Sequence, residues 1–190
     1  MRVAAVFAAL LAASAAAGAG AAPDADLRIR PGVGVGKLRL GMTEAQVRAA
    51  LGRPRVVIRR PAGFGSVVAD WEFGYAEYTV RFFGRPGRLR ATRVGTTLWR
   101  ERTPRGIGVG SLERVLRSTY PGLRCERLET SRWQGVVQLL STSRTCTLFT
   151  ASGRRTIFVS TMSANVFGPP TRAEWQRRAR VAEVAVAEPR

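Results

Sequence analysis

The chain has 190 residues but no histidine, a single lysine (Lys37) and only two cysteines. Without histidine there can be no Ser-His-Asp triad, no Cys-His dyad and no His-ligated metal site. Two cysteines are too few for a Cys₄ zinc site or for an iron–sulfur cluster held by four thiolates. Acidic residues are scarce as well, with 13 against 31 basic residues. We therefore expect a non-enzymatic protein with no cofactor and no bound metal.

Two local patterns suggest chemistry, and each has a simpler explanation. The Gly32–Lys37 segment is glycine-rich, but a phosphate-binding loop needs Gly where Pro31 stands and Ser or Thr where Leu38 stands. Asp70 and Glu72 lie two residues apart on an expected strand, as a carboxylate pair for glycoside hydrolysis would. Because arginines surround them, we expect ion pairing on a solvated face. No catalytic residue is assigned.

The first 21 residues have the pattern of a secretory signal peptide. Arg2 precedes an apolar run, residues 3–17, and small-x-small cleavage sites end at Ala19 and Ala21. A buried Ala-rich helix or a membrane anchor is the alternative, but a span needs about 20 consecutive apolar residues. No cysteine lies near the cleavage site, so we do not expect a lipoprotein. The sequence predicts an extracytoplasmic protein, secreted or held at the cell envelope, without a membrane span in its mature part.

Export changes the interpretation of the cysteines. Cys125 and Cys146 form an even pair, and in an oxidising compartment the default for such a pair is a disulfide. The alternative is two separate buried thiols. A catalytic thiol is disfavoured because the chain has no histidine to activate it.

Two helix-start signals occur, one in each half of the chain. In the first, Gly41 precedes Thr43, an expected N-cap, and Gln46 completes a capping box. In the second, Gly110 and Ser111 precede an apolar stripe at helical spacing. Superposed without a gap, the two signals lie 69 residues apart. A rival register aligns the glycine-rich segments 31–36 and 105–110 instead.

Similar strand patterns follow each signal. Runs rich in Val, Thr and aromatic residues, separated by Gly/Pro turns, predict strands near residues 55–59, 70–75, 78–83 and 89–97, and then near 124–128, 135–140, 145–150 and 155–163. We expect an α+β fold of two related repeats, each with a helix on an antiparallel sheet of three to four strands. A chance similarity of two ordinary α+β segments is the alternative.

This organisation divides the chain into five parts. They are a signal peptide (1–21), a flexible lead-in (22–35), a first repeat (36–102), a second repeat with the disulfide (103–165), and a C-terminal helix or tail (166–190). The tail carries a capping box of Thr171 with Glu174, and Trp175 begins an apolar face that extends to Val186. We expect a weakly packed helix there.

The segment from Leu40 to Val47, with the closing Leu51-Gly52-Arg53-Pro54, resembles the helix-opening motif of a group of small exported α+β domains. The group includes secreted β-lactamase-inhibitor proteins and the small lipoproteins of outer-membrane barrel assembly. The inhibitors are tandem repeats, and that resemblance implies a similar architecture for residues 30–165. The chain differs from the lipoproteins in lacking an acylated cysteine, and from the inhibitors in its basic charge and single cysteine pair. No partner-binding residue is transferred.

Arginine is the remaining candidate for function. The formal net charge is +18, and +17 without residues 1–21. Guanidinium groups bind phosphates and carboxylates in bidentate geometry. We take as candidate anion contacts Arg55, Arg59, Arg60, Arg88, Arg90 and Arg93. The bias of a GC-rich genome toward arginine is the alternative explanation. The sequence thus predicts an exported interaction module with a protein or cell-envelope partner, or else a basic protein that binds polyanions such as anionic lipid, wall polymer or nucleic acid without specificity.

Overall fold

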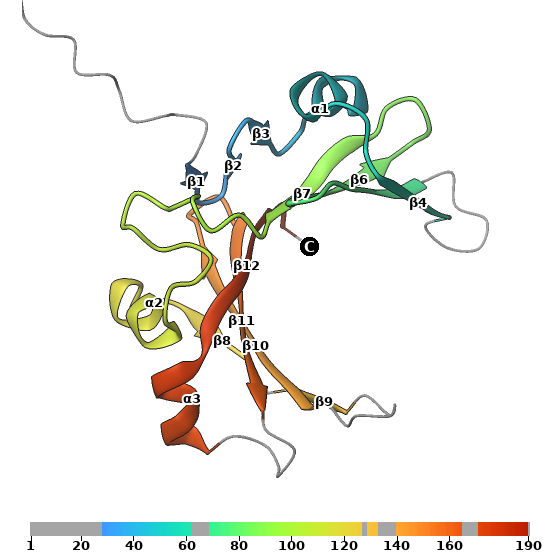
Figure 1. Ribbon diagram of the computed structural model, residues 1–190. Helices are drawn as coiled ribbons and strands as arrows, with labels where there is room; N and C mark the ends of the chain where they lie inside the picture. Colours follow the sequence, from blue (N-terminus) through green and yellow to red (C-terminus); the bar gives the residue numbers. More distant parts are fainter. Residues whose placement is uncertain (1–27, 62–68, 127–128, 133–139, 165–170, 190) are drawn as a thin grey trace, which may run out of the picture.

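The protein is built around one large antiparallel sheet, seen in a computed structural model that describes residues 28–61, 69–126, 129–132, 140–164 and 171–189 (Figure 1). The first half of the chain contributes a meander of β4 (Val56–Pro61), β5 (Ala69–Gly74), β6 (Tyr78–Gly84) and β7 (Arg90–Thr96). The second half contributes β8 (Arg124–Cys125), β9 (Glu129–Arg132), β10 (Leu140–Phe149), β11 (Arg155–Ala164) and β12 (Arg180–Ala187). The strand order is β4-β5-β6-β7-β12-β11-β10-β8, and β9 pairs with β10.

In the described part of the chain, three helices and a small sheet lie on one face of the large sheet, so the fold is α+β as expected (Figure 1). The helices are α1 (Glu44–Leu51), α2 (Glu113–Thr119) and α3 (Arg172–Arg178), and the small sheet is formed by β1 (Ile29–Arg30), β2 (Gly34–Val35) and β3 (Leu38–Arg39). The two halves of the large sheet are inclined to each other, with the helices outside the bend.

The prediction for the C-terminal tail was wrong beyond residue 178. The capping box of Thr171 and Glu174 opens α3 as expected, and Trp175 is buried. The helix then stops at Arg178, and residues 180–187 form β12 between β7 and β11. Strand pairing on both sides satisfies the backbone of this segment and buries its Val and Ala side chains, which outweighs the local helix propensity of Ala and Glu.

The expected lead-in and one expected strand also differ from the structure. Residues 1–27, and with them the signal peptide, lie outside the described residues. Residues 28–35 contain β1 and β2, and Ile29 and Val35 are fully buried, so this part is an ordered element of the fold. The strand expected at 135–140 falls almost entirely outside the described residues, whereas the one expected at 145–150 belongs to the longer strand β10.

The first helix starts as the sequence predicts. Thr43 Oγ1 accepts a hydrogen bond from the Gln46 N–H, and the Gln46 side chain accepts one from the Thr43 N–H. The second helix differs, because its N-cap is Leu112 without a side-chain hydrogen bond. Ser111 Oγ instead accepts a hydrogen bond from the Gly108 N–H in the preceding turn. Gly41 and Gly110 both have positive φ, 82° and 86°, a conformation that favours glycine.

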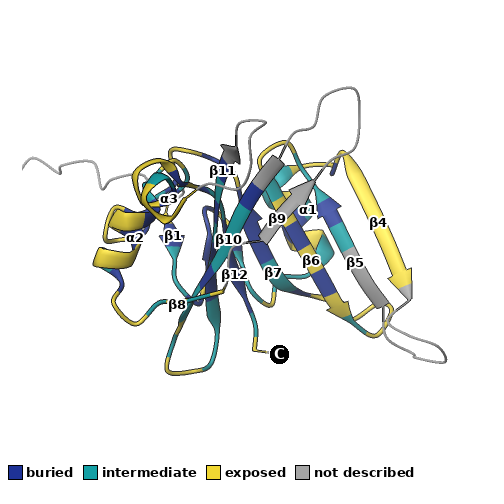
Figure 2. Cartoon of the chain, turned by 90° about the horizontal axis from the view of Figure 1, so that it is seen from below, coloured by how far each residue is buried: buried dark blue, intermediate teal, exposed yellow. Residues whose placement is uncertain are grey.

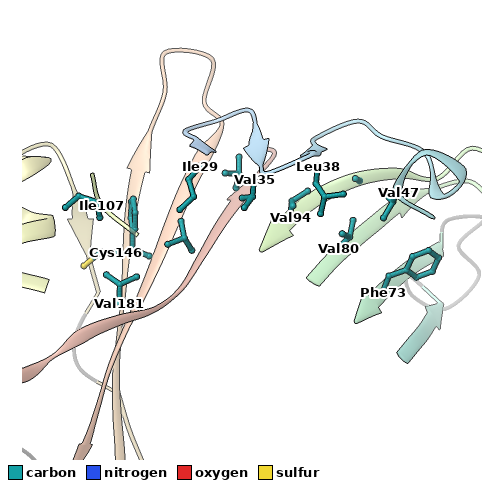
Figure 3. Close-up of a cluster of buried hydrophobic side chains, with 14 of the residues drawn as sticks. Ile29, Val35, Leu38, Val47, Phe73, Val80, Val94, Ile107, Cys146 and Val181 are labelled. Atoms are coloured by element: carbon teal, nitrogen blue, oxygen red, sulfur yellow. The ribbon is translucent and has the colours of Figure 1, made fainter. Parts of the chain in front are cut away.

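A continuous core lies between the large sheet and the elements that cover it (Figure 3). Val47 of α1 packs in the same cluster as Phe73 and Val80 of the sheet, and Leu116 of α2 belongs to this cluster too. The Arg48 guanidinium lies 4.6 Å from the centre of the Phe73 ring. The small sheet adds its own buried residues, Ile29, Val35 and Leu38. A second cluster consists of Trp175 of α3, Ala179 directly after that helix, and Met162 of β11.

The predicted disulfide is present. Cys125 on β8 and Cys146 on β10 are directly opposite each other in the strand register and are bonded. Cys146 is fully buried. The bond therefore attaches the short edge strand β8 to the core of the second half.

Replacing the N-cap, Thr43→Ala, should lower the free energy of unfolding by about 1 kcal/mol, because the Gln46 N–H loses its acceptor. Urea denaturation measures this. The matched control is Thr97→Ala, an exposed threonine outside helices and strands, with an expected change within about 0.5 kcal/mol. Equal effects of the two substitutions would contradict the capping interpretation.

Without reduction, the purified protein should show no alkylated cysteine in an intact-mass measurement, since both sulfurs are bonded. Reduction opens a loop whose two cysteines are separated by 21 positions in sequence. The lost constraint on the unfolded chain should lower the free energy of unfolding by about 3 kcal/mol. Two thiols that react before reduction would refute the bond.

Candidate interaction surface

The large sheet has one covered and one uncovered face, and the alternation along β6 shows the division. Val80 and Phe82 are buried toward the helices, whereas Thr79, Arg81 and Phe83 are exposed on the opposite side (Figure 2). All three helices and the small sheet lie on the first side in the described part of the chain (Figure 1). We call the side that carries Thr79 and Arg81 the open face. It lies inside the bend of the sheet.

The strand register extends the open face across both halves. Residues directly opposite each other in neighbouring strands share a face. One row runs through Ile58, Glu72, Arg81, Arg93, Ala187, Arg155 and Phe149. A second row runs through Val56, Gly74, Thr79, Gly95, Ala185, Ile157, Thr147 and Arg124. The open face is thus a single surface that spans the junction of β7 and β12.

Small residues keep the centre of the open face low. A Cβ atom on Gly95 would lie 2.7 Å from Thr79 Oγ1 and 3.0 Å from Glu183 Oε1, so glycine is required for the present packing. Beside it is a hollow of about 200 Å³ lined by Glu72, Thr79, Arg81, Arg93 and Glu183.

Ion pairs organise the charges of this surface. Arg93 Nη2 donates to Glu183 Oε1 at 3.0 Å, which links β7 to β12. Arg60 Nη1 lies 3.7 Å from Glu72 Oε2, which links β4 to β5. This pair agrees with the ion-pairing role expected for Glu72. Asp70 is on β5 too, but its side chain lies outside the described residues.

Exposed apolar side chains lie toward the margins of the open face. Val56 and Ile58 on β4 are 54% and 37% exposed, and Phe83 on β6 is 49% exposed. Phe149, at the end of β10, is 47% exposed, and the Arg124 guanidinium lies 5.3 Å from its ring centre. Apolar groups interspersed with arginine are typical of protein interfaces.

The structure brings together three of the six candidate anion contacts. Arg60, Arg90 and Arg93 lie on the open face, where Arg90 is directly opposite Phe83. Arg59 lies on β4 with the opposite alternation, toward the covered side. The other two, Arg55 and Arg88, are exposed in the segments before β4 and before β7.

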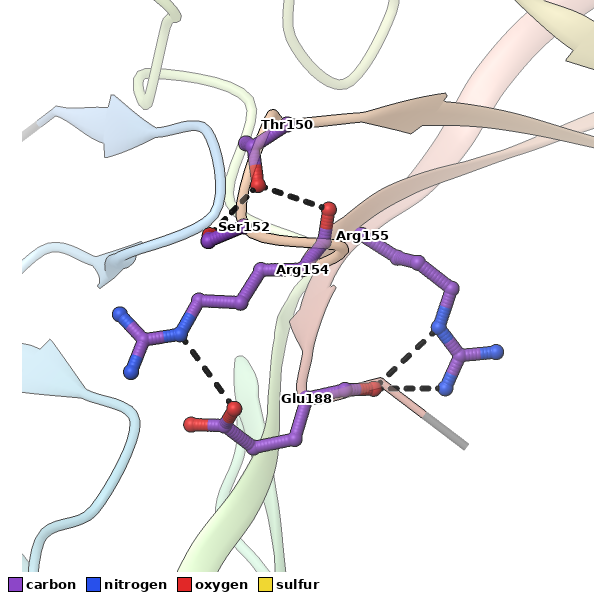
Figure 4. Close-up of polar contacts among 5 residues, drawn as sticks. All are labelled: Thr150, Ser152, Arg154, Arg155 and Glu188. Carbon is purple, nitrogen blue, oxygen red and sulfur yellow. Dashed lines mark hydrogen bonds and ion pairs between the residues drawn. The ribbon is translucent and has the colours of Figure 1, made fainter.

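Polar contacts connect Glu188, the residue after β12, to the turn between β10 and β11 (Figure 4). The Arg155 guanidinium donates from Nε and Nη2 to the Glu188 carbonyl oxygen, at 3.3 and 2.8 Å. Arg154 Nε donates to Glu188 Oε2 at 3.3 Å. Thr150 Oγ1 donates to the Arg154 carbonyl oxygen and is within 3.0 Å of Ser152 Oγ. These contacts hold residue 188 against the β10–β11 turn.

One buried ionisable pair lies away from the open face. Tyr78 Oη donates to Glu101 Oε1 at 2.7 Å, and Glu101 is fully buried. Among the described residues, no hydrogen-bond donor reaches Glu101 Oε2. Burial raises the pKa of Glu101, and the hydrogen bond from Tyr78 opposes that rise. We assign this pair a structural role, because Glu101 belongs to the segment between β7 and α2 that joins the two halves, and Tyr78 belongs to β6.

The described residues contain no cluster of His, Cys, Asp or Glu suited to a metal ion. In the same part of the chain, no helix has the length and apolar character needed to cross a membrane.

Replacing the buried carboxyl, Glu101→Gln, should stabilise the protein increasingly as pH rises. Since the folded-state pKa is above the unfolded value, the favourable contribution of protonated Glu101 is complete below the unfolded pKa and is lost as pH rises through the folded pKa. Each unit by which the folded-state pKa exceeds the unfolded one corresponds to about 1.4 kcal/mol in the free energy of unfolding. Urea denaturation at several pH values measures the difference from wild type. Exposed Glu126→Gln is the control, and a pH-independent difference for Glu101→Gln would contradict the prediction.

Comparison of the chain with protein-family models, with curated proteins and with solved structures finds no match in any of the three.

Proposed function

We propose that this protein is an exported, non-enzymatic interaction module whose open face receives an acidic surface of a partner protein. The observation that carries the proposal is the open face itself, a sheet surface across two halves of the chain with no covering layer in the described residues (Figure 1).

The chemistry of the open face supports a protein partner over a bare polyanion. Phe83 and Arg90 lie directly opposite each other, and both are exposed, so an apolar contact and a cation are presented together. Two of the face's arginines, Arg60 and Arg93, are already paired with glutamates. A polyanion would have to compete with these carboxylates, whereas a protein surface can supply both apolar groups and acidic groups.

The net charge, +18 for the full chain and +17 without residues 1–21, favours an acidic partner. A positive field of this size accelerates association with acidic surfaces and disfavours basic ones. Apolar contacts at the margin of the face would then hold the complex when salt screens the charges.

The two halves of the chain are related repeats in this proposal. The helices α1 and α2 begin 69 residues apart, at Glu44 and Glu113, which is the spacing of the ungapped superposition. Val47 and Leu116, equivalent at this spacing, are both fully buried. Outward from the β7–β12 junction, the strands on each side follow in reverse order of sequence. They are β7, β6, β5 and β4 on one side and β12, β11, β10 and β8 on the other. These similarities support a duplication that placed two helix-and-sheet units edge to edge.

An extracytoplasmic location belongs to the same proposal. The Cys125–Cys146 disulfide is of the kind that persists in oxidising compartments, and the N-terminal sequence has the pattern of a signal peptide. A basic protein that binds polyanions through charge alone is the competing function.

The decisive experiment compares capture of proteins from envelope and culture fractions by wild type and two matched variants. The face variant is Phe83→Ser with Arg90→Glu. The control is Val33→Ser with Arg53→Glu, which removes one exposed apolar group and one exposed arginine away from the open face. We expect an acidic protein that wild type and control retain at about 200 mM salt and that the face variant loses.

Two results would contradict this function. Loss of capture in the control to the same extent as in the face variant would show that charge alone is responsible. Capture that disappears for all three proteins between about 50 and 200 mM salt would favour the polyanion-binding function.

A further inference from the structure

A second surface lies on the helical side of the molecule, between α2 and α3. The two helices lie next to each other on the outside of the bend (Figure 1). Between them is an open pocket of about 440 Å³ lined by Glu113, Arg114, Arg117, Arg172, Ala173, Gln176 and Arg177. This volume is within the range of small-molecule sites, about 300–1,000 Å³. The pocket is separate from the open face, which is on the other side of the sheet.

Among the described residues that line the pocket, the one carboxylate is that of Glu113, and it is already neutralised. Glu113 is 2% exposed, and its Oε1 accepts a hydrogen bond from Arg144 Nη1 at 2.9 Å. Its Oε2 accepts one from Trp175 Nε1 at 2.7 Å. The Arg144 guanidinium also lies 5.5 Å from the centre of the Trp175 ring. This buried network attaches α2 and α3 to β10, and so it fixes the floor of the pocket.

The four arginines of the pocket are thus left with an excess of positive charge. Arg114 and Arg117 come from α2, and Arg172 and Arg177 come from α3, and all four are exposed. Glu174 offsets part of the charge of Arg177, and its own pKa is lowered chiefly by the hydrogen bonds within the Thr171 cap. Four like charges around one hollow repel each other, and a bound anion would relieve that repulsion.

We propose that this pocket binds a ligand with two neighbouring phosphate groups, such as a diphosphate. A phosphate monoester carries about −1.5 to −2 at neutral pH, so two of them match four guanidinium groups where one does not. Arginine binds phosphate oxygens in bidentate geometry, and cations on two helices can hold the two phosphates from opposite sides. Gln176 adds an amide donor to the lining.

Isothermal titration calorimetry of the full chain with inorganic diphosphate and with inorganic phosphate tests the pocket at about 0.15 M ionic strength. The pocket variant is Arg117→Gln with Arg172→Gln. The matched control, Arg53→Gln with Arg85→Gln, removes the same charge from two exposed positions outside the pocket and outside the open face. We expect wild type to prefer diphosphate to phosphate by about tenfold or more, and the pocket variant to lose at least that factor. The control should change affinity less than about twofold.

A second arm identifies the source of the phosphates. Phosphatidylcholine vesicles containing diacylglycerol diphosphate, a lipid whose headgroup carries two linked phosphates, are tested for binding to the same three proteins. If the pocket variant loses vesicle binding and the control keeps it, the result supports a lipid headgroup as the ligand. If the pocket variant loses only the binding of free diphosphate, and the control keeps it, the result supports a soluble ligand. Equal losses in pocket variant and control, or no binding by wild type in either arm, would overturn the proposal.

A footprint on the wild-type protein makes the test independent of any substitution. Diphosphate should protect Arg114, Arg117, Arg172 and Arg177 from modification by phenylglyoxal, while Arg53 reacts as before. Protection of Arg53 to the same extent would overturn the assignment to the pocket. Because the open face takes no part in this binding, the result does not depend on whether a protein partner exists.

Discussion

The pairing of β7 with β12 is the constraint on which the rest of the structure depends. The register joins Val94 to Val186 and Thr96 to Val184, and the Arg93–Glu183 ion pair crosses the same junction. The last strand of the chain is thereby inserted between the two halves and pairs with β11 on its other side. Without this pairing there would be two small sheets. With it there is one bent sheet, a covered face with a continuous core, and an open face inside the bend.

The local elements of the fold could be predicted from sequence, whereas their assembly could not. Capping boxes at Thr43 and Thr171 correctly located two helix starts, and the alternation and turns of the first half located its four strands. The segment 180–187 was predicted as helix because it follows the capping box of Thr171 and because Trp175, Ala179, Ala182 and Val186 can share one helical face. A central strand buried on both faces has no need of alternation, so its identity depends on distant partners.

The binding surfaces show the same limit. Composition revealed an arginine excess, but not which arginines gather in one place. Arg60, Arg90 and Arg93 share the open face because of the strand register. The sequence predicted that Glu72 forms an ion pair, but it did not identify Arg60 as the partner. The ion pair between Arg93 and Glu183 was not predicted. The arginines of the α2–α3 pocket lie about 60 residues apart in sequence, and they were not among the predicted contacts. They become neighbours because α2 and α3 lie side by side, linked by the hydrogen bond from Trp175 to Glu113.

Amide hydrogen exchange followed residue by residue tests the central role of the β7–β12 junction most directly. If the two halves form one cooperative unit, the hydrogen-bonded amides of β7 and β12 should be among the slowest to exchange, and they should share one opening free energy with those of β6 and β11. The opposite result would be β12 amides that exchange much faster than β6 or β11, or two halves with separate opening free energies. Either would mean that the open face is not a single surface.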